Sequence, residues 1–131
     1  MNSTTYGNFT ISAEYTGSKP APADSGNTNH SFVTVRSGDT NRAAVFDAWT
    51  TSGHAMLTTH GDLMAALFNI VMEVSLGAND FEDFCSAIGY DENDPKAKAN
   101  RETCRASYTK FINMSDFNND ELNDLLIALE G

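Results

Sequence analysis

The chain has 131 residues and a formal net charge of −10, from 18 acidic and 8 basic side chains. This length suits one domain, and a hydrophobic content of 40% is too high for a wholly disordered chain. So large an excess of acid argues against direct binding to nucleic acid, because contacts with phosphate groups need Lys and Arg. It suits a soluble protein, or one that attaches to something basic.

The sequence has no pattern for export or for membrane insertion. The opening residues, MNSTTYGNFT, lack the basic and apolar regions of a signal peptide. The most apolar run, residues 63–76, has only 14 residues and includes Asn69 and Glu73, so it is too short to span a bilayer. We therefore expect a cytoplasmic protein without membrane contacts, in which the cysteines stay reduced.

The first part of the chain, residues 1–52, predicts β-structure. Between Phe9 and Tyr15, apolar and polar residues alternate, which is typical of a half-buried strand. Residues 31–50 hold two β-rich runs around a short glycine-containing turn, the pattern of a hairpin. Residues 17–29 contain two of the three prolines, together with Gly, Ser and Asn, and predict a loop.

The second part of the chain predicts four helices, of which the first two have clear boundaries. Thr59 and Asp62 resemble a capping box before the first helix, which we expect to end at Gly77. Apolar residues lie nearly all round this helix, so it should be the central buried one. The second helix should be capped by Asn79 and end at Gly89.

The third and fourth helices also have recognisable starts. Asp94 and Pro95, an N-cap followed by proline at the first helical position, are the strongest helix start in the chain. This third helix should run to about Ile112. Asn118 and Glu121 should cap the fourth helix, whose leucines fall on one stripe.

These elements predict an α+β fold, a small antiparallel sheet followed by four helices, in one domain of residues 1–131. The hairpin should pair with the strand at residues 8–16. In the helical part, residues 59–131, the helix at residues 60–76 should cover the sheet. The side chains expected to be buried are Leu67, Ile70, Val71, Val74, Phe81, Phe84, Tyr108 and Phe111.

The two cysteines, Cys85 and Cys104, fall on the inner faces of the second and third helices. There they can serve as small buried hydrophobic residues. A redox or metal-binding role would need more ligands or surroundings that lower the thiol pKa, and neither feature lies beside them in the sequence. We expect two free thiols in the core.

Candidates for catalysis or zinc binding are few. The three histidines, His30, His54 and His60, lack the spacing of a zinc site. A nucleophilic triad could be drawn from Ser52, His54 and Asp62, but three such common residues are expected to occur together by chance. We expect no catalytic residue, no bound metal and no cofactor.

A calcium site is also suggested only in part. Asp116, Asn118 and Asp120 copy the first half of a calcium-binding loop, but Glu121 and Ile127 stand where the loop needs glycine and glutamate. Capping of the last helix explains this cluster better.

The acids concentrate late in the chain. Residues 73–131 hold 13 of the 18 acids, while their five bases all lie on the third predicted helix, so we expect the acids before and after that helix to lack local neutralisation. This distribution can be a solvated acidic face, or a negative surface that docks on a basic groove as a mimic of nucleic-acid phosphate. The candidate partner-binding residues are Asp80, Glu82, Asp83, Asp91, Glu92, Asp94, Asp116, Asp120, Glu121 and Asp124.

The segment from Phe81 to Phe111 resembles one that recurs in small uncharacterised bacteriophage proteins. Those chains join a Phe-x-x-Phe/Trp-Cys run to Gly-Tyr-Asp, an Asp-Ser-Arg-Lys-Ala helix start and a second cysteine. The matching residues here are Phe81, Phe84, Cys85, Gly89, Tyr90, Asp91, Asp94, Lys96, Ala97 and Cys104. Pro95 stands where serine is usual, and Ala99-Asn100 departs from a Tyr-containing turn. The resemblance covers residues 63–112 and implies a phage origin, not a chemistry.

A small acidic phage protein without catalytic residues resembles anti-CRISPR and anti-restriction proteins, many of which occupy the nucleic-acid channel of a defence complex. The resemblance implies an inhibitor in the host cytoplasm whose partner is a CRISPR effector or another DNA-binding defence nuclease. The alternative is a phage structural or assembly accessory, or an adaptor, that binds another protein through the sheet and its loops without enzymatic activity.

Overall fold

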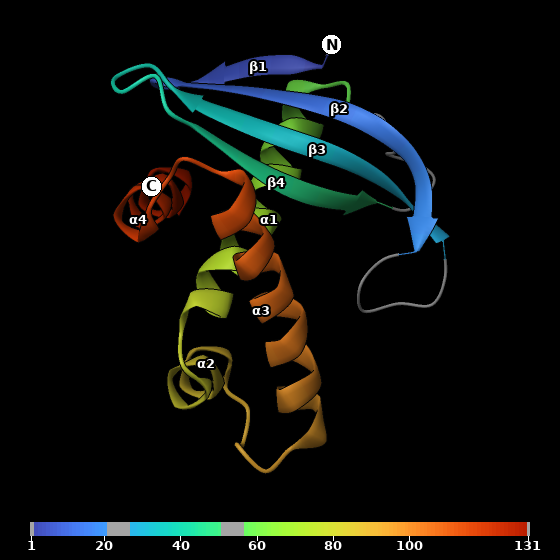
Figure 1. The fold of residues 1–131 in the computed structure, drawn as a ribbon, viewed down its shortest axis with the longest axis vertical. Helices are drawn as coiled ribbons and strands as arrows, with labels where there is room; N and C mark the ends of the chain where they lie inside the picture. The colour runs from blue at the N-terminus through green and yellow to red at the C-terminus, as the bar shows by residue number, and fades with distance from the viewer. Residues whose placement is uncertain (1, 21–26, 51–56, 131) are drawn as a thin grey trace.

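The computed structural model describes residues 2–20, 27–50 and 57–130. This part of the chain holds four strands followed by four helices (Figure 1). The strands are β1 (Ser3–Tyr6), β2 (Phe9–Pro20), β3 (Asn27–Ser37) and β4 (Ala43–Thr50). The helices are α1 (His60–Ala78), α2 (Phe81–Ile88), α3 (Pro95–Met114) and α4 (Asn119–Glu130). The predicted α+β class, with strands before helices, is confirmed.

The strands form one antiparallel sheet in the order β1-β2-β3-β4. As predicted, the hairpin of β3 and β4 pairs with β2, with Ile11 opposite Val35. The apolar pattern does not predict β1, because Tyr6 is the only large apolar side chain among its four residues. β1 leads into β2 through a turn at Gly7, where φ is 58°, a conformation that glycine adopts without strain.

The predicted loop at residues 17–29 is wrong at both of its described ends. β2 continues to Pro20 and β3 begins at Asn27, and a bulge after Tyr15 lets Gly17 pair with His30. Mostly polar residues fill both extensions, so the sequence there lacks the alternation that marks the rest of the strands. The middle of the predicted loop lies outside the described residues.

The sheet packs one face against α1, as predicted, and this contact forms the main core. The ring of Phe111 on α3 stacks on Phe46 of β4, with ring centroids 5.3 Å apart. The residues confirmed as buried are Leu67, Val71, Val74, Phe84 and Phe111. Ile70, Phe81 and Tyr108 are only half-buried, because Ile70 and Phe81 line surface hollows and the Tyr108 hydroxyl reaches Asn119.

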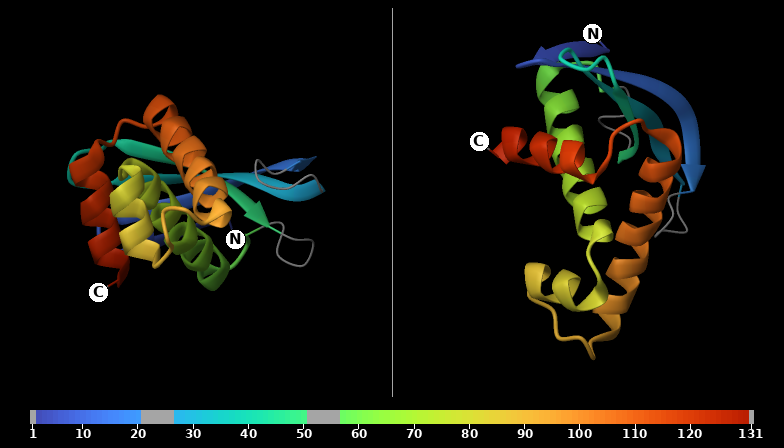
Figure 2. Two further views of the ribbon diagram at one scale, coloured as in Figure 1. Left: turned by 90° about the horizontal axis from the view of Figure 1, so that it is seen from below. Right: turned by 60° about the vertical axis from the view of Figure 1, so that its left-hand side comes forward.

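α1 is central but not buried all round. It packs against α2, α3, α4 and the sheet, and Figure 2 shows α3 beside it with α4 crossing it. The opposite flank carries Ala65, Asn69 and Met72, which are exposed because these elements cover only one side of the helix. The prediction of all-round burial is therefore wrong. By length and composition α1 also passes for a membrane span, as core helices do, so the lack of membrane contact stays a prediction.

Two predicted boundaries shift around residue 78. Gly77 does not end α1 but lies buried within it, where a Cβ atom would sit 2.0 Å from the carbonyl oxygen of Cys104. This glycine therefore lets the backbones of α1 and α3 touch. Asp80, not Asn79, caps α2, because its carboxylate accepts from the Asp83 amide at 2.8 Å while Asn79 caps the end of α1. The predicted starts of α1, α3 and α4, and the stop at Gly89, are confirmed.

Candidate functional site

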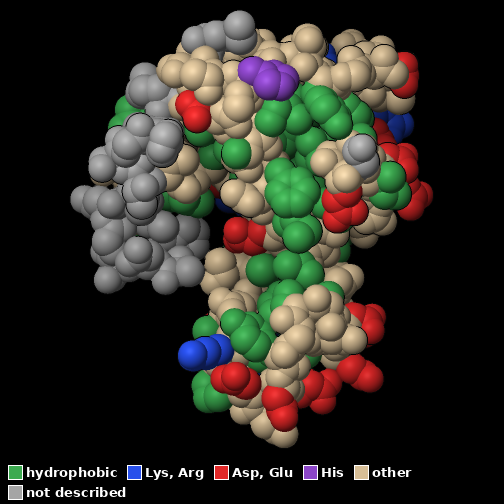
Figure 3. Space-filling model, turned by 180° about the vertical axis from the view of Figure 1, so that it is seen from behind, with side chains coloured by type: hydrophobic (Ala, Val, Ile, Leu, Met, Phe, Trp, Pro, Cys, Tyr) green, Lys and Arg blue, Asp and Glu red, His purple; other side chains and the backbone are tan. Residues whose placement is uncertain are grey.

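The first group of predicted partner-binding acids gathers at one end of the molecule. We call this group the acidic corner: Asp80, Glu82, Asp83, Asp91, Glu92 and Asp94. Glu82 and Asp83 lie in the first turn of α2 and the other four flank this helix, which lies at the end away from the sheet; five of the six are exposed while Asp94 is half-buried (Figure 1). In Figure 3 acidic side chains gather at this lower end.

Local folding explains why three of these acids stand there. Asp80 and Asp94 cap α2 and α3, and the Asp94 carboxylate accepts from the Lys96 amide at 3.0 Å. The Asp91 carboxylate closes the turn between the helices by accepting from the Asn93 amide at 2.9 Å. Each of these hydrogen bonds uses one carboxylate oxygen, so capping and solvent exposure are compatible at these positions.

The charge of the acidic corner is not compensated within the described part of the chain. None of its six carboxylates forms an ion pair there with a Lys or Arg side chain. The nearest bases in sequence, Lys96, Lys98 and Arg101, project from α3 without pairing with the corner. The corner is thus a patch of exposed negative charge.

The second group of predicted acids lies elsewhere, at the start of α4. It comprises Asp116, Asp120, Glu121 and Asp124. The Arg42 guanidinium, from the turn before β4, donates to the Glu121 carboxylate at 2.6 Å. The expectation that these acids lack local neutralisation is therefore wrong for Glu121, because a base distant in sequence reaches it across the fold. Figures 1 and 2 show α4 beside the sheet, apart from α2, so the predicted acids form two surfaces.

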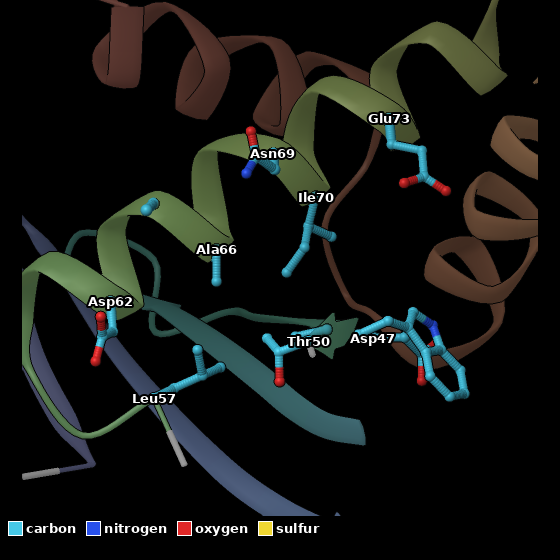
Figure 4. A pocket seen from close by; sticks show the side chains of 11 residues that line it. Asp47, Thr50, Leu57, Asp62, Ala66, Asn69, Ile70 and Glu73 are labelled. Atoms are coloured by element: carbon cyan, nitrogen blue, oxygen red, sulfur yellow. The ribbon is translucent and has the colours of Figure 1, made fainter. Parts of the chain in front are cut away.

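A groove on the exposed flank of α1 was not predicted. It consists of two hollows, of about 450 and 440 Å³, that share Asn69 and Glu73. The first lies between α1 and the end of β4, where Figure 4 shows Ala66 and Ile70 pointing toward Thr50. We call the two hollows together the α1 groove. An apolar helix pattern gives no sign of a groove, because the pattern alone does not say which side is covered.

The second hollow of the groove lies beside the two cysteines. It lies between α1, α2 and α3, and Phe84, Tyr90 and Cys104 line it. Burial, and secondarily the Glu73 carboxylate, raise the pKa of Cys104 to about 11, while burial followed by Glu92 and Asp91 raises the pKa of Cys85. Thiols with raised pKa values stay protonated at neutral pH and are poor nucleophiles. Both cysteines are free, as predicted.

A buried polar network on the sheet is the other feature that sequence patterns missed. His30 on β3 is 2% exposed, and its Nδ1 lies 2.5 Å from the Thr16 hydroxyl on β2. Its Nε2 donates to the Asp47 carboxylate on β4 at 2.5 Å, and the Lys110 ammonium of α3 approaches the same carboxylate at 3.2 Å. The alternation of side chains within each strand does not predict that residues of three different strands meet in this network.

A hydroxyl residue, a histidine and an aspartate also make up nucleophilic triads, but the arrangement here is that of a structural hydrogen-bond network. Both ring nitrogens of His30 are engaged within the protein, and the ring packs between Phe32 and Trp49 at centroid distances of 4.8 and 4.5 Å. A general base needs a nitrogen facing a substrate-bound proton. The network instead joins β2, β3, β4 and α3.

The remaining catalytic and metal candidates do not assemble within the described residues. Ser52 and His54 lie outside them, and His60 contacts the Thr4 hydroxyl at 2.6 Å, away from His30. The described part of the chain contains no group of three or more His, Cys, Asp or Glu side chains that could hold a metal ion. Asn118 and Glu121 cap α4 by reciprocal hydrogen bonds, as expected for a helix start.

Comparison with protein-family models, curated proteins and solved structures finds no match for this chain. Its function is therefore argued from the acidic corner.

Proposed function

We propose that this protein is a non-enzymatic inhibitor that places its acidic corner on a basic, nucleic-acid-binding surface of a host defence complex. The observation that carries the proposal is the set of six carboxylates at one end of the fold, without an ion pair among the described residues. The resemblance of residues 81–111 to phage proteins supports a defence complex as the target.

Charge complementarity explains how such a protein would act. A channel that holds a phosphate backbone is lined by Lys and Arg, and a compact negative surface is attracted to it over several ångströms. Once bound, the corner occupies the volume that DNA needs, so that DNA binding or cleavage is blocked without chemistry. Inhibition of this kind weakens with salt, because exposed charges are screened.

The second candidate function is a phage assembly accessory or adaptor. One feature favours it: β1 is the outermost strand of the sheet, and only β2 pairs with it among the described strands. An open strand edge can accept a strand from another protein.

Affinity purification from host cells, followed by mass spectrometry, tests both candidates. The tagged protein should retain a CRISPR effector or a defence nuclease, and adding it to that purified complex should abolish DNA binding or cleavage. Recovery of a capsid or tail component, with no effect on any nuclease, would replace the inhibitor with the assembly accessory.

A further inference from the structure

The α1 groove is a feature of the described surface that the acidic corner does not explain. The buried side of α1 carries Leu63, Leu67, Val71 and Val74, whereas the groove follows the opposite flank. Met72, on this flank, is 38% exposed although it belongs to the most apolar helix of the chain. In Figure 3 apolar side chains continue down the middle of the face that α1 presents.

The two hollows form one elongated site. Their α1 residues, from Asp62 through Asn69 to Leu76, follow helical spacing along one side of α1. At 1.5 Å per residue this side extends over about 21 Å, or roughly four helical turns. The length matches a short helix laid along α1.

The chemistry of the groove defines what could fill it. Its surfaces are mostly apolar, with Leu57 and Ile70 in the first hollow and Phe84 and Ile88 in the second. The charged residues that line the two hollows are the acids Asp47, Asp62 and Glu73, but the Asp47 carboxylate is already paired with His30 and Lys110, so the charge argument rests on Glu73, which both hollows share. No lysine or arginine is among the lining residues, so the groove combines an apolar floor with negative charge.

We propose that the α1 groove binds a basic amphipathic helix of a partner protein. An apolar stripe on that helix would cover the floor of the groove, while its Lys and Arg residues would face Glu73, where the two hollows meet, and the acidic corner beyond the second hollow. Tyr90, at the far end of the groove, directly precedes Asp91 of the acidic corner. A basic partner could therefore contact both surfaces at once.

A second copy of this chain fits the groove poorly. Apart from Arg42, which pairs with Glu121, its bases outside the sheet all lie on α3, but the apolar residues of α3, Ala97, Cys104 and Phe111, are buried in its own fold. A docking helix must present an apolar stripe together with its bases. Two chains of net charge −10 also repel each other.

This inference goes beyond the proposed function and shares with it only the need for a basic protein partner. It is tested with a fluorescent peptide of about 18 residues in which leucines at helical spacing alternate with lysines and arginines. A scrambled peptide of the same composition has the same charge but no apolar stripe. The titration follows fluorescence anisotropy with the full-length protein.

The decisive variant is Asn69→Arg, because Asn69 is exposed, so that the fold should tolerate the change, and lies where the hollows meet. Its matched control is Asn123→Arg, at an exposed position on α4, which changes the net charge equally. We expect saturable binding of the amphipathic peptide, a loss of about tenfold or more with Asn69→Arg, and a change below about threefold with Asn123→Arg. Circular dichroism confirms that both variants fold.

Three results would overturn the proposal: no saturable binding up to about 1 mM peptide, equal effects of the two variants, or equal binding of the scrambled peptide. A variant in which Asp91, Glu92 and Asp94 of the acidic corner are reversed to Lys separates this test from that of the proposed function. If the corner substitutions abolish nuclease inhibition while Asn69→Arg leaves peptide binding unchanged, only the groove proposal fails. If peptide binding depends on Asn69 but no nuclease is inhibited, only the proposed function fails.

Discussion

The sheet end and the α2 end of the molecule are stabilised by cores of different size. Among the described residues the main core has 15 buried members, whereas the cluster beneath α2 has four: Phe84, Cys85, Ala97 and Cys104. The acidic corner stands on the smaller cluster. The main core and the acidic corner thus lie in different parts of the fold, and changes at the two ends should have different consequences.

The largest loss of stability should follow truncation in the main core. Phe111→Ala removes a ring that is 1% exposed and stacks on Phe46, so the free energy of unfolding should fall by about 3–5 kcal/mol. The adjacent Ile112 is 44% exposed, and Ile112→Ala should change stability by about 0.5 kcal/mol or less. Urea denaturation measures both. Similar losses for the two variants would contradict the assignment of stability to the main core.

A smaller loss of stability is expected from a change at the contact between α1 and α3, near the α2 end of the molecule. In Gly77→Ala the new methyl group meets the Cys104 backbone, and separating the helices should cost about 1–3 kcal/mol. Gly61, in the first turn of α1, has no atom within 4 Å of its added Cβ, so Gly61→Ala should gain roughly 0.5–1 kcal/mol through helix propensity. Thermal unfolding should give the two variants opposite signs; a gain for both would show that the helices do not touch at Gly77.

The sequence was informative at most helix ends, where a local interaction fixes the structure, although it misplaced the boundary between α1 and α2. Asp94 with Pro95, and Gly89 with a φ of 78°, define helix ends through bonds between near neighbours, and these boundaries are correct. β1 and the polar extensions of β2 and β3 were missed because backbone pairing, not an apolar pattern, holds them in the sheet.

The same distinction applies to the candidate site. The acidic corner could be predicted because its six residues are close in sequence and lie in α2 or just before and after it. The Arg42–Glu121 ion pair spans 79 positions, and the His30 network joins three strands and a helix. Neither the ion pair nor the network can be predicted from the local sequence. The α1 groove depends on which flank of an apolar helix its neighbours leave open, which is a property of packing.

The small cluster under α2 should tolerate loss of its thiols. Cys85→Ala and Cys104→Ala each remove one buried sulfur atom, at an expected cost of roughly 1–2 kcal/mol or less. Zinc that stays bound at one ion per chain through dialysis against a chelator would show instead that the cysteines are metal ligands.

The thiols also predict a pH dependence at this end. Burial raises the pKa of Cys104 from 9.0 to about 11, so the native state holds its proton more tightly than the unfolded chain does. This contribution to stability is complete below pH 9 and is lost as the pH rises toward 11, since the unfolded state then binds fewer protons. When the pH is raised, the free energy of unfolding should fall less in Cys104→Ala than in the parent protein. Urea denaturation at each pH measures this difference. An identical pH dependence would contradict the raised pKa.

A small effect on stability, and the largest on binding, is expected at the acidic corner. Reversing Asp91, Glu92 and Asp94 to Lys removes the Asp94 helix cap, worth about 1 kcal/mol, and the hydrogen bond from the Asn93 amide to Asp91, and otherwise leaves the fold intact because these side chains are outside the core. Binding to the purified partner should weaken by about tenfold or more at low salt. The difference between variant and parent should shrink as salt rises, because charges beyond about 8 Å are screened at physiological ionic strength.

The matched control reverses Glu14, Asp39 and Glu130, three exposed acids away from the corner. Asp47 is unsuitable, because its carboxylate holds His30 and Lys110 and a reversal would disturb the sheet. If the protein instead docks through its sheet, the control set should weaken binding more than the corner set, since Glu14 lies on β2 and Asp39 in the β3–β4 turn. Isothermal titration of both sets against one partner decides between the surfaces. Unchanged affinity of the corner variant at low salt would end the mimic hypothesis, because a surface that docks by charge cannot lose and reverse three charges without effect.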